Sequence, residues 1–476
     1  MMRAPGFKFP ALMVALVSSL LLASTGEAAQ LTRAPYLQLV TPTSALVAFR
    51  TDADCQPQVR YGLGGDTSQV ARASASGRLH AVELQGLRPG SEYSYVVEAC
   101  GATTQANRFV TAPAPGTMRA HFGVVGDFGT GGTAERDVSN SMLRNKPELV
   151  VGVGDGAYEN GTEEEHQQHL FEPMAALLSQ VPMFPTSGNH EYNTNQAQPY
   201  LDNFYLPTNN PAHTERYYSF DWGPVHFVSL DSNCVIGLAT KASCDPAAQL
   251  AWLEADLAAT RQPWKIAFFH HPPWSSGDHG SILKARSSFS PILERYGVDL
   301  ALTGHDHFYE RSYPMKGNAR ASDGIPYIVA GNGGNPHAPF PSAKPDWSAA
   351  RIQQQAGYLD VTIDGGLLSA RMVTPSGAVL DSFQLSKTVT APPATTPPAT
   401  TPPSQGETSG STPPVSPTGP EVTSPGTSGP DSTPAVPGAP GEPAAAGCSS
   451  TGAQALFTLV LPVAWSLLMW RRRPRS

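Results

Sequence analysis

Five apolar runs in the middle of the chain end on residues that can bind metal ions. The runs are FGVVGD, ELVVGVGD, PMFPTSGNH, KIAFFH and DLALTGHDH, and their ends supply these side chains: Asp127, Asp155, Asn189 with His190, His270, His305 and His307. Carboxylate, amide and imidazole groups suit Fe, Zn or Mn. Side chains just past the carboxyl ends of strands in an α/β sheet converge on one edge, so we expect one site with enough ligands for two ions.

A glycine stands directly before the ligand in four of these runs, at Gly126, Gly154, Gly188 and Gly304. Glycine allows a tight turn or a close approach that a side chain would block. Each motif alone is weak evidence, because a G-D-x-G sequence is often only a turn and a single buried histidine is often a core residue. Together the five runs predict a dinuclear metal site.

The order of these motifs resembles that of calcineurin-like metallophosphoesterases, and specifically of purple acid phosphatases. The matching segments are GDFG (126–129), GDGAY (154–158), GNHE (188–191), His270 and GHDH (304–307). One departure is Ala267, where the family has valine, and it only trims a strand side chain. The resemblance spans residues 31 to about 385. It implies hydrolysis of phosphate monoesters at acidic pH, by in-line attack of a metal-bound hydroxide.

The resemblance also assigns the ligands of a site that holds Fe(III) and a divalent ion, which is Zn, Mn or Fe(II). It gives Asp127, Tyr158 and His307 to Fe(III), makes Asp155 the bridge, and gives Asn189, His270 and His305 to the divalent ion. In purple acid phosphatases the tyrosine phenolate binds ferric iron and produces the visible colour. The alternative for Tyr158 is a core tyrosine that packs under a loop.

Two further histidines are candidates for contact with the phosphate. His279 follows the ligand His270 by nine residues, as the family's substrate-binding histidine does, and it is our candidate proton donor to the leaving group. The alternative is an ordinary histidine of an exposed loop. His190 lies inside the GNHE motif. We expect His271 to pack outside the ligand set, and we expect scaffold roles for Asp306, Glu310 and Arg311.

Residues 31 to 112 consist of short strand patterns separated by turn signals, expected at 44–51, 58–61, 81–87, 92–98 and 107–111. The sequence LRPGSEYSY (87–95) resembles the L-x-P-G-x-x-Y-x-Y signature of fibronectin type III sandwiches. We therefore expect two domains: an all-β fibronectin type III-like sandwich over residues 30–114, then an α/β metallophosphoesterase domain over 119–387, built as a β-sandwich flanked by helices. A helix that begins with a capping box of Thr162 and Glu165 is expected at 162–180.

The two ends of the chain predict export. Residues 1–29 have the basic start, apolar run and small residues of a signal peptide. Residues 388–447 are rich in proline and lack lysine, arginine and aromatic residues, which predicts an extended stalk. Residues 448–476 resemble the C-terminal sorting tag of myxobacterial surface proteins, so Cys448 is expected to be processed and lipidated and to attach the protein to the cell envelope. The alternative is a permanent tail anchor.

Export permits disulfides, and we expect the pairs Cys55–Cys100 and Cys234–Cys244. In a fibronectin-like fold the first pair would lie close together. The 31 Lys and Arg against 39 Asp and Glu argue against nucleic-acid binding. The expected substrate is a small phosphate ester, the expected location is the cell surface or release from it, and a homodimer is expected by analogy only.

Two rival interpretations stay open at this point. One is another dinuclear metallophosphoesterase, a phosphodiesterase or nucleotidase with two divalent ions. The other is a surface adhesin that keeps this fold without activity. The presence of all seven ligand positions in the chain argues against the adhesin.

Overall fold

The computed structural model describes residues 30–334, 339–341 and 343–389. The predicted signal peptide, the stalk from residue 390 onward and the predicted tail with Cys448 lie outside the described residues. Within the described ranges, no helix has the length and apolar character needed to cross a membrane.

Residues 31–110 form two antiparallel sheets, which we call the N-terminal module. One sheet has the order β1-β2-β5, and in the other β3 lies between β4 and β6, while β6 also pairs with β7 and β8. The strands are β1 (Leu31–Gln38), β2 (Ser44–Cys55), β3 (Gln58–Leu63), β4 (Gln69–Arg72), β5 (Gly77–Gln85), β6 (Glu92–Ala99), β7 (Ala102–Thr103) and β8 (Asn107–Val110). All five expected strands are confirmed, and β1, β4 and β7 are additional.

Two local features of the N-terminal module agree with the sequence pattern. The Tyr93 hydroxyl accepts a hydrogen bond of 2.9 Å from the backbone N–H of Arg88, five residues upstream. Cys55 at the end of β2 forms a disulfide with Cys100 just after β6. In the following domain Cys234 pairs with Cys244. Both predicted disulfides are therefore confirmed.

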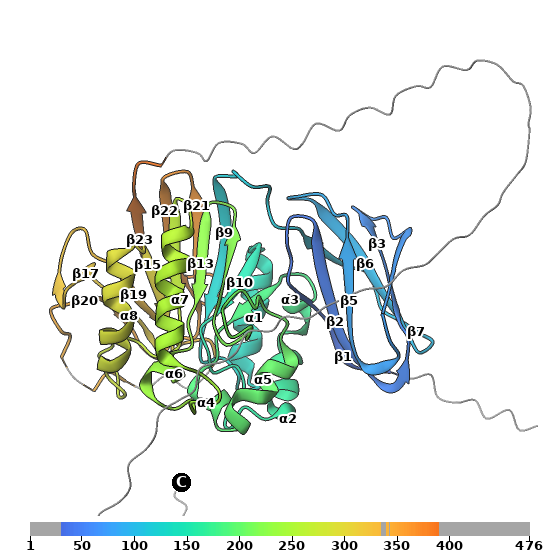
Figure 1. The fold of residues 1–476 in the computed structure, drawn as a ribbon, viewed down its shortest axis with the longest axis horizontal. Coiled ribbons are helices and arrows are strands. Elements are labelled where there is room, and N and C mark those ends of the chain that lie inside the picture. Colours follow the sequence, from blue (N-terminus) through green and yellow to red (C-terminus); the bar gives the residue numbers. More distant parts are fainter. Residues whose placement is uncertain (1–29, 335–338, 342, 390–476) are drawn as a thin grey trace, which may run out of the picture. The chain divides into compact units, whose positions relative to one another are not determined.

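The following domain contains a six-stranded and a seven-stranded sheet (Figure 1). The first has the order β11-β10-β9-β21-β22-β23, with β9 (Arg119–Val125), β10 (Leu149–Gly152), β11 (Met183–Pro185), β21 (Tyr358–Asp364), β22 (Leu367–Val373) and β23 (Val379–Ser386). The second has the order β12-β13-β14-β15-β19-β16-β20, with β12 (Tyr218–Trp222), β13 (Val225–Ser229), β14 (Trp264–Phe268), β15 (Leu300–Thr303), β16 (Tyr309–Ser312), β19 (Tyr327–Ala330) and β20 (Ser348–Ile352). A small hairpin pairs β17 (Met315–Lys316) with β18 (Ala319–Arg320).

Aromatic side chains pack between the two large sheets. The rings of Phe122 on β9 and Phe227 on β13 meet edge to face with centroids 5.1 Å apart. The rings of Phe184 on β11 and Phe220 on β12 stack at 4.0 Å. Helices α1 (Thr133–Asn145), α7 (Pro246–Ala259) and α8 (Leu283–Arg295) flank the sheets (Figure 1). The expected β-sandwich flanked by helices is the fold of this domain.

The expectation that all ligand-bearing strands share one sheet is wrong. The five apolar runs are strands β9, β10, β11, β14 and β15, as expected. The first three, however, pair in parallel in the six-stranded sheet, and the other two pair in the seven-stranded sheet. The candidate site therefore lies where the carboxyl ends of strands from two packed sheets meet.

The expected helix at 162–180 is also corrected. Its capping box is present, with Thr162 and Glu165 in reciprocal hydrogen bonds. The segment then divides into α2 (Glu163–His166), a π-helical turn η1 (Gln167–Phe171) and α3 (Ala175–Leu178). Pro173 lies between the second and third pieces, and a proline has no N–H to continue a helix. The remaining helices are α4 (Asn189–Tyr192), η2 (Asn195–Ala197), α5 (Gln198–Asn203) and α6 (Ser232–Ile236).

His226, which the sequence did not single out, connects α7 to the seven-stranded sheet. Its Nδ1 lies 2.7 Å from Oδ1 of Asp221 on β12, and its Nε2 lies 2.8 Å from Oδ2 of Asp256 on α7. Burial lowers the pKa of His226, but the hydrogen bonds to the two carboxylates outweigh it and raise the pKa to about 9. The folded protein therefore holds an imidazolium here at neutral pH.

We expect His226→Gln to lower the free energy of unfolding by an amount that depends on pH. A pKa raised above the ordinary 6.5 contributes stability that is complete below pH 6.5 and is lost as the pH rises through about 9. Urea unfolding should show a difference from wild type of up to about 3 kcal/mol near pH 6 that shrinks toward about pH 10. A difference that is constant over this range would contradict the ion pair.

Candidate metal centre

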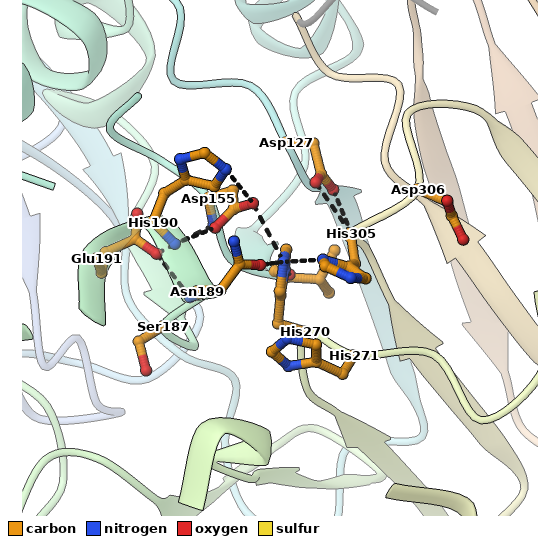
Figure 2. A network of polar contacts seen from close by, with 12 residues as sticks. Asp127, Asp155, Ser187, Asn189, His190, Glu191, His270, His271, His305 and Asp306 are labelled. Atoms are coloured by element: carbon orange, nitrogen blue, oxygen red, sulfur yellow. Dashed lines mark hydrogen bonds and ion pairs between the residues drawn. The ribbon is translucent and has the colours of Figure 1, made fainter. Parts of the chain in front are cut away.

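The structure brings all seven predicted ligand residues to one place. Figure 2 labels five of them: Asp127, Asp155, Asn189, His270 and His305. Asp127 follows β9, Asp155 follows β10, and Asn189 begins α4 after β11. His270 follows β14, and His305 follows β15. Asp127, Asp155 and His305 have left-handed backbones with φ of 54°, 54° and 75°. Such conformations are uncommon outside glycine and concentrate at functional sites.

Two of the glycines before the ligands are required by close approach. A Cβ on Gly188 would lie 2.0 Å from Oδ1 of Asp155, and one on Gly304 would lie 2.4 Å from Oδ2 of Asp127. Neither position has room for a side chain. The expected reason for these glycines is confirmed.

One half of the site surrounds the hydroxyl of Tyr158. This oxygen lies 3.2 Å from Oδ1 of Asp127, 3.3 Å from Oδ2 of Asp155 and 3.1 Å from Nε2 of His307. Nε2 of His307 lies 3.5 Å from Oδ1 of Asp127. The side chain of Tyr158 is thus part of the cluster, and its role as a ligand stays a prediction.

The other half surrounds Nε2 of His270. This nitrogen lies 3.0 Å from Oδ1 of Asn189, 3.2 Å from Oδ2 of Asp155 and 3.2 Å from Nδ1 of His305. Oδ2 of Asp155 contacts both halves, because it also faces the hydroxyl of Tyr158. Its position between the two halves is the one that a bridging ligand needs, and the bridging role stays a prediction.

The donor set fits a pair of metal ions. Nδ1 of His270 lies 2.9 Å from the carbonyl oxygen of Val153, to which it can donate, and this leaves the lone pair of Nε2 directed at the cluster. That nitrogen faces a carboxylate oxygen and an amide oxygen, and all three atoms can act as acceptors. The side chains of Asp127 and Asp155 are fully buried. Without a cation, Nε2 of His270 can face the Asp155 oxygen only if it carries a proton, and a metal ion among these atoms would take the place of that proton.

The pKa values of the cluster reflect burial and mutual charge. Burial raises the pKa of Asp127 well above that of an ordinary carboxyl. Burial lowers the pKa of His270, but the nearby carboxylate of Asp155 outweighs it and raises the pKa to about 10. Burial lowers the pKa of His305 to about 3 and that of His307 to about 4. The last two are neutral imidazoles, the form in which histidine binds metals.

Glu191 is a functional residue that the sequence analysis quoted in the GNHE motif without giving it a role. Its buried carboxylate accepts hydrogen bonds from the backbone N–H groups of Gly188 at 2.6 Å, Gly156 at 2.8 Å and Asp155 at 3.2 Å. It therefore ties the start of α4 to the loop that carries Asp155. The only sequence signal for this role was its position inside a ligand motif.

His190 and His279 both lie beside the cluster. The ring of His190 meets the ring of Tyr158 edge to face at 4.5 Å, and its backbone N–H donates to Oδ1 of Asp155. The ring of His279 packs 4.2 Å from the ring of His305, and its side chain is 51% exposed. The structure therefore places both candidates beside the cluster, and their contact with a substrate stays a prediction.

His271 lies closer to the ligands than the expectation of packing outside the ligand set suggests. The ligand nitrogens of His270, His271 and His305 all fall within 4.8 Å of one another. Nδ1 of His271 lies 2.8 Å from the Ser232 hydroxyl, and burial lowers its pKa well below the ordinary value. With one nitrogen engaged by Ser232, the contacts favour a packing role, and that role stays a prediction.

Asp306, Glu310 and Arg311 make the scaffold contacts that were expected of them. Asp306 accepts from the backbone N–H of His279 at 3.1 Å and lies 3.0 Å from its Nδ1. Glu310 accepts from the N–H and hydroxyl of Ser276. Arg311 forms an ion pair with Asp381. The first two residues thereby hold the loop that carries His279.

Comparison with known families agrees with this geometry. The model of the calcineurin-like phosphoesterases matches residues 120–309, and that of the iron/zinc purple acid phosphatase-like protein C region matches residues 324–382. The chain belongs to the purple acid phosphatase family. Membership of this family implies iron together with a divalent metal. It also supports the assignment of the chain as a metal-dependent acid phosphatase.

Individual relatives are named as members of the same family. Purple acid phosphatase 15 of Arabidopsis thaliana is 30% identical over 300 residues, covering 55% of this chain and 54% of the relative. Probable inactive purple acid phosphatase 1 of the same plant is 30% identical over 387 residues, covering 69% and 61%. The chain thus spans little more than half the length of these relatives. The structure of a purple acid phosphatase from yellow lupin seeds shares the fold, with a TM-score of 0.65, 21% identity and 74% of each chain covered.

We expect Glu191→Gln to weaken metal binding, because an amide cannot accept from all three backbone N–H groups. Loss of such a supporting contact typically costs about 10- to 100-fold in metal affinity. Metal content per chain, measured after dialysis against graded zinc concentrations, checks this. Glu164→Gln, at an exposed position of the same charge, is the matched control and should bind as wild type does. Equal affinities for both variants would contradict the supporting role.

Proposed function

We propose that the protein is a purple acid phosphatase that hydrolyses phosphate monoesters of small molecules. The observation that carries the proposal is the convergence of seven oxygen and nitrogen donors from two sheets, with Asp155 between the two halves. Family membership supports the reaction class. The match covers 54% and 61% of the length of two relatives. The activity of the whole protein is therefore proposed here.

The proposed ligand sets follow the two halves of the cluster. Asp127, Tyr158 and His307 would hold Fe(III), Asn189, His270 and His305 would hold Zn, Mn or Fe(II), and Asp155 would bridge. The anionic set suits the harder trivalent ion, and the neutral amide and imidazoles suit the divalent ion. When bound, the pair of ions would supply Lewis acidity for a phosphate group and lower the pKa of a water molecule.

His279 and His190 would act on the substrate itself. The hydrogen bond to Asp306 raises the pKa of His279, which favours its protonated form. Its half-exposed ring could then bind a phosphate oxygen and donate a proton to the departing alkoxide. His190, beside Tyr158, would contact the phosphate from another side. The net charge of the chain is −8, so an anionic substrate needs such local positive charge.

We also propose that the protein is exported and attached to the cell envelope through its C-terminal tail. The two disulfides support an oxidising location. The N-terminal module would be a fibronectin type III-like sandwich, which the hydrogen bond at Tyr93 and the order of the strands support. Attachment through Cys448 would be visible as lipid-modified protein in a membrane fraction, lost in Cys448→Ser.

An inactive protein on this fold is the second candidate, because one relative of 30% identity is named probable inactive. All seven ligand positions are kept in this chain, which favours activity. Turnover of p-nitrophenyl phosphate by the metal-loaded protein decides between the two. Absence of turnover with both metals bound would support the inactive alternative.

We expect the protein loaded with iron and zinc to have a visible absorption band that Tyr158→Phe abolishes. The band would come from charge transfer between phenolate and Fe(III), and Phe has no oxygen to supply it. A spectrum with metal analysis checks this. Tyr313→Phe, at an exposed tyrosine, is the control. A wild-type protein that holds two divalent ions and has no band would favour the phosphodiesterase or nucleotidase interpretation.

We expect His279→Asn to lower kcat/KM by roughly 10²- to 10⁴-fold for an alkyl phosphate. The loss should be clearly smaller for p-nitrophenyl phosphate, because nitrophenolate leaves without needing a proton. Steady-state kinetics with both substrates checks this, and His213→Asn serves as the control at an exposed histidine. An equal loss for both substrates would leave His279 a phosphate contact and exclude the proton-donor role.

A further inference from the structure

Two arginines of the N-terminal module reach the helix that follows Tyr158. Nη2 of Arg33 on β1 lies 2.9 Å from Oε1 of Glu163, and Arg50 on β2 donates to the same oxygen. Both arginines also donate to Oδ1 of Asn203 at the end of α5. Asn203 in turn donates to Oε2 of Glu163 at 2.8 Å. We call this pair of arginines the arginine clamp.

The clamp holds both ends of the α2–η1 segment. Glu163 is the first residue of α2, and Arg33 also donates through Nε to Oε1 of Gln167 at 2.7 Å. The guanidinium of Arg33 lies 3.7 Å from the ring centroid of Phe171, the last residue of η1. The side chain of Arg33 is only 1% exposed. A buried, fully engaged arginine is held in one geometry, so it can fix what it contacts.

The same α2–η1 segment holds the backbone around Tyr158. The carboxylate of Glu165 accepts from the N–H groups of Glu159 at 2.8 Å, Thr162 at 2.9 Å and Asn160 at 3.0 Å. Nδ1 of His169 lies 2.7 Å from the carbonyl oxygen of Tyr158, to which it donates. The residues from Tyr158 to Thr162 are therefore attached to the helix that the clamp holds.

His169 also connects this loop to the one that follows Asp127. A Cβ on Gly131 would lie 2.8 Å from Cδ2 of His169, so the ring packs directly against that glycine. The backbone N–H of Tyr158 donates to the carbonyl oxygen of Gly129 at 2.8 Å. A displacement of α2–η1 would therefore move the carriers of two predicted ligands.

We propose that Arg33 and Arg50 are positioning residues for the metal centre, so that the N-terminal module is part of the catalytic apparatus. Through α2–η1 the clamp sets the place of Tyr158, whose hydroxyl must meet Asp127, Asp155 and His307 together. Misplacement of a site by about 1 Å is enough to impair it. The assignment of Tyr158 as a ligand rests on the proposed function, whereas the mechanical connection does not.

Arg50→Met in the full chain tests the clamp while leaving the buried Arg33 in place. Arg78→Met is the matched control, because Arg78 is on β5 of the same module and pairs with the exposed Asp54. In metal-free protein, amide hydrogen exchange at residues 159–162 should become roughly tenfold faster in Arg50→Met, as expected for the loss of one charge-assisted hydrogen bond. Arg78→Met should exchange as wild type does.

The metal-loaded protein supplies a second readout. Arg50→Met should shift or weaken the visible band of Tyr158 and lower kcat, whereas a purely stabilising clamp would lower the melting temperature and leave the band unchanged. His169→Phe breaks the connection at its other end without touching the N-terminal module. It should reproduce both effects, and it replaces Arg50→Met if that variant does not fold. The double variant should show less than the sum of the two effects.

Two outcomes separate this inference from the proposed function. Exchange at residues 159–162 that is the same in Arg50→Met, His169→Phe and wild type would overturn the clamp, whatever the enzyme does. A wild-type protein without a visible band would count against the proposed function, and the exchange measurement in metal-free protein would still decide on the clamp.

Discussion

The burial of two carboxylates is the constraint on which this structure depends. Asp127 and Asp155 lie fully inside the protein, among a phenol, an amide and three imidazoles. Burying such charge is unfavourable unless cations or hydrogen bonds compensate it. The loops must therefore bring their ligands together closely, and the left-handed backbones of both aspartates and the glycines beside them follow from that requirement.

Around this cluster, a second set of contacts holds the loops in place. Glu191 accepts hydrogen bonds from three backbone N–H groups. Asp306 and Glu310 hold the loop that carries His279, and Glu165 holds the loop that follows Tyr158. Asp306 and Glu310 accept from residues about 30 positions away, Glu191 accepts both from its own motif and from the loop of Asp155, and Glu165 accepts from the loop that directly precedes its helix. Such supporting contacts give a metal site its geometry, because they fix ligands that single loops would leave free to move.

Local pattern was enough to predict much of the molecule. The five ligand-bearing strands, five strands of the N-terminal module and both disulfides are present as expected, since apolar runs, turn residues and cysteine pairs are local signals. The division of the ligand strands between two sheets was missed, because strand periodicity does not say which strands pair. The break of the helix at 162–180 was missed although Pro173 was visible in the sequence.

By itself, then, the sequence determined which residue types stand after each strand, and hence the chemistry of the donors. The tertiary structure decided which donors share a half of the site, and it showed Asp155 between them. It alone revealed Glu191, His169 and the arginine clamp as supports. Arg33 and Glu163 are 130 residues apart along the chain, so their contact arises only when the N-terminal module packs on α2, a long-range event that no local pattern records.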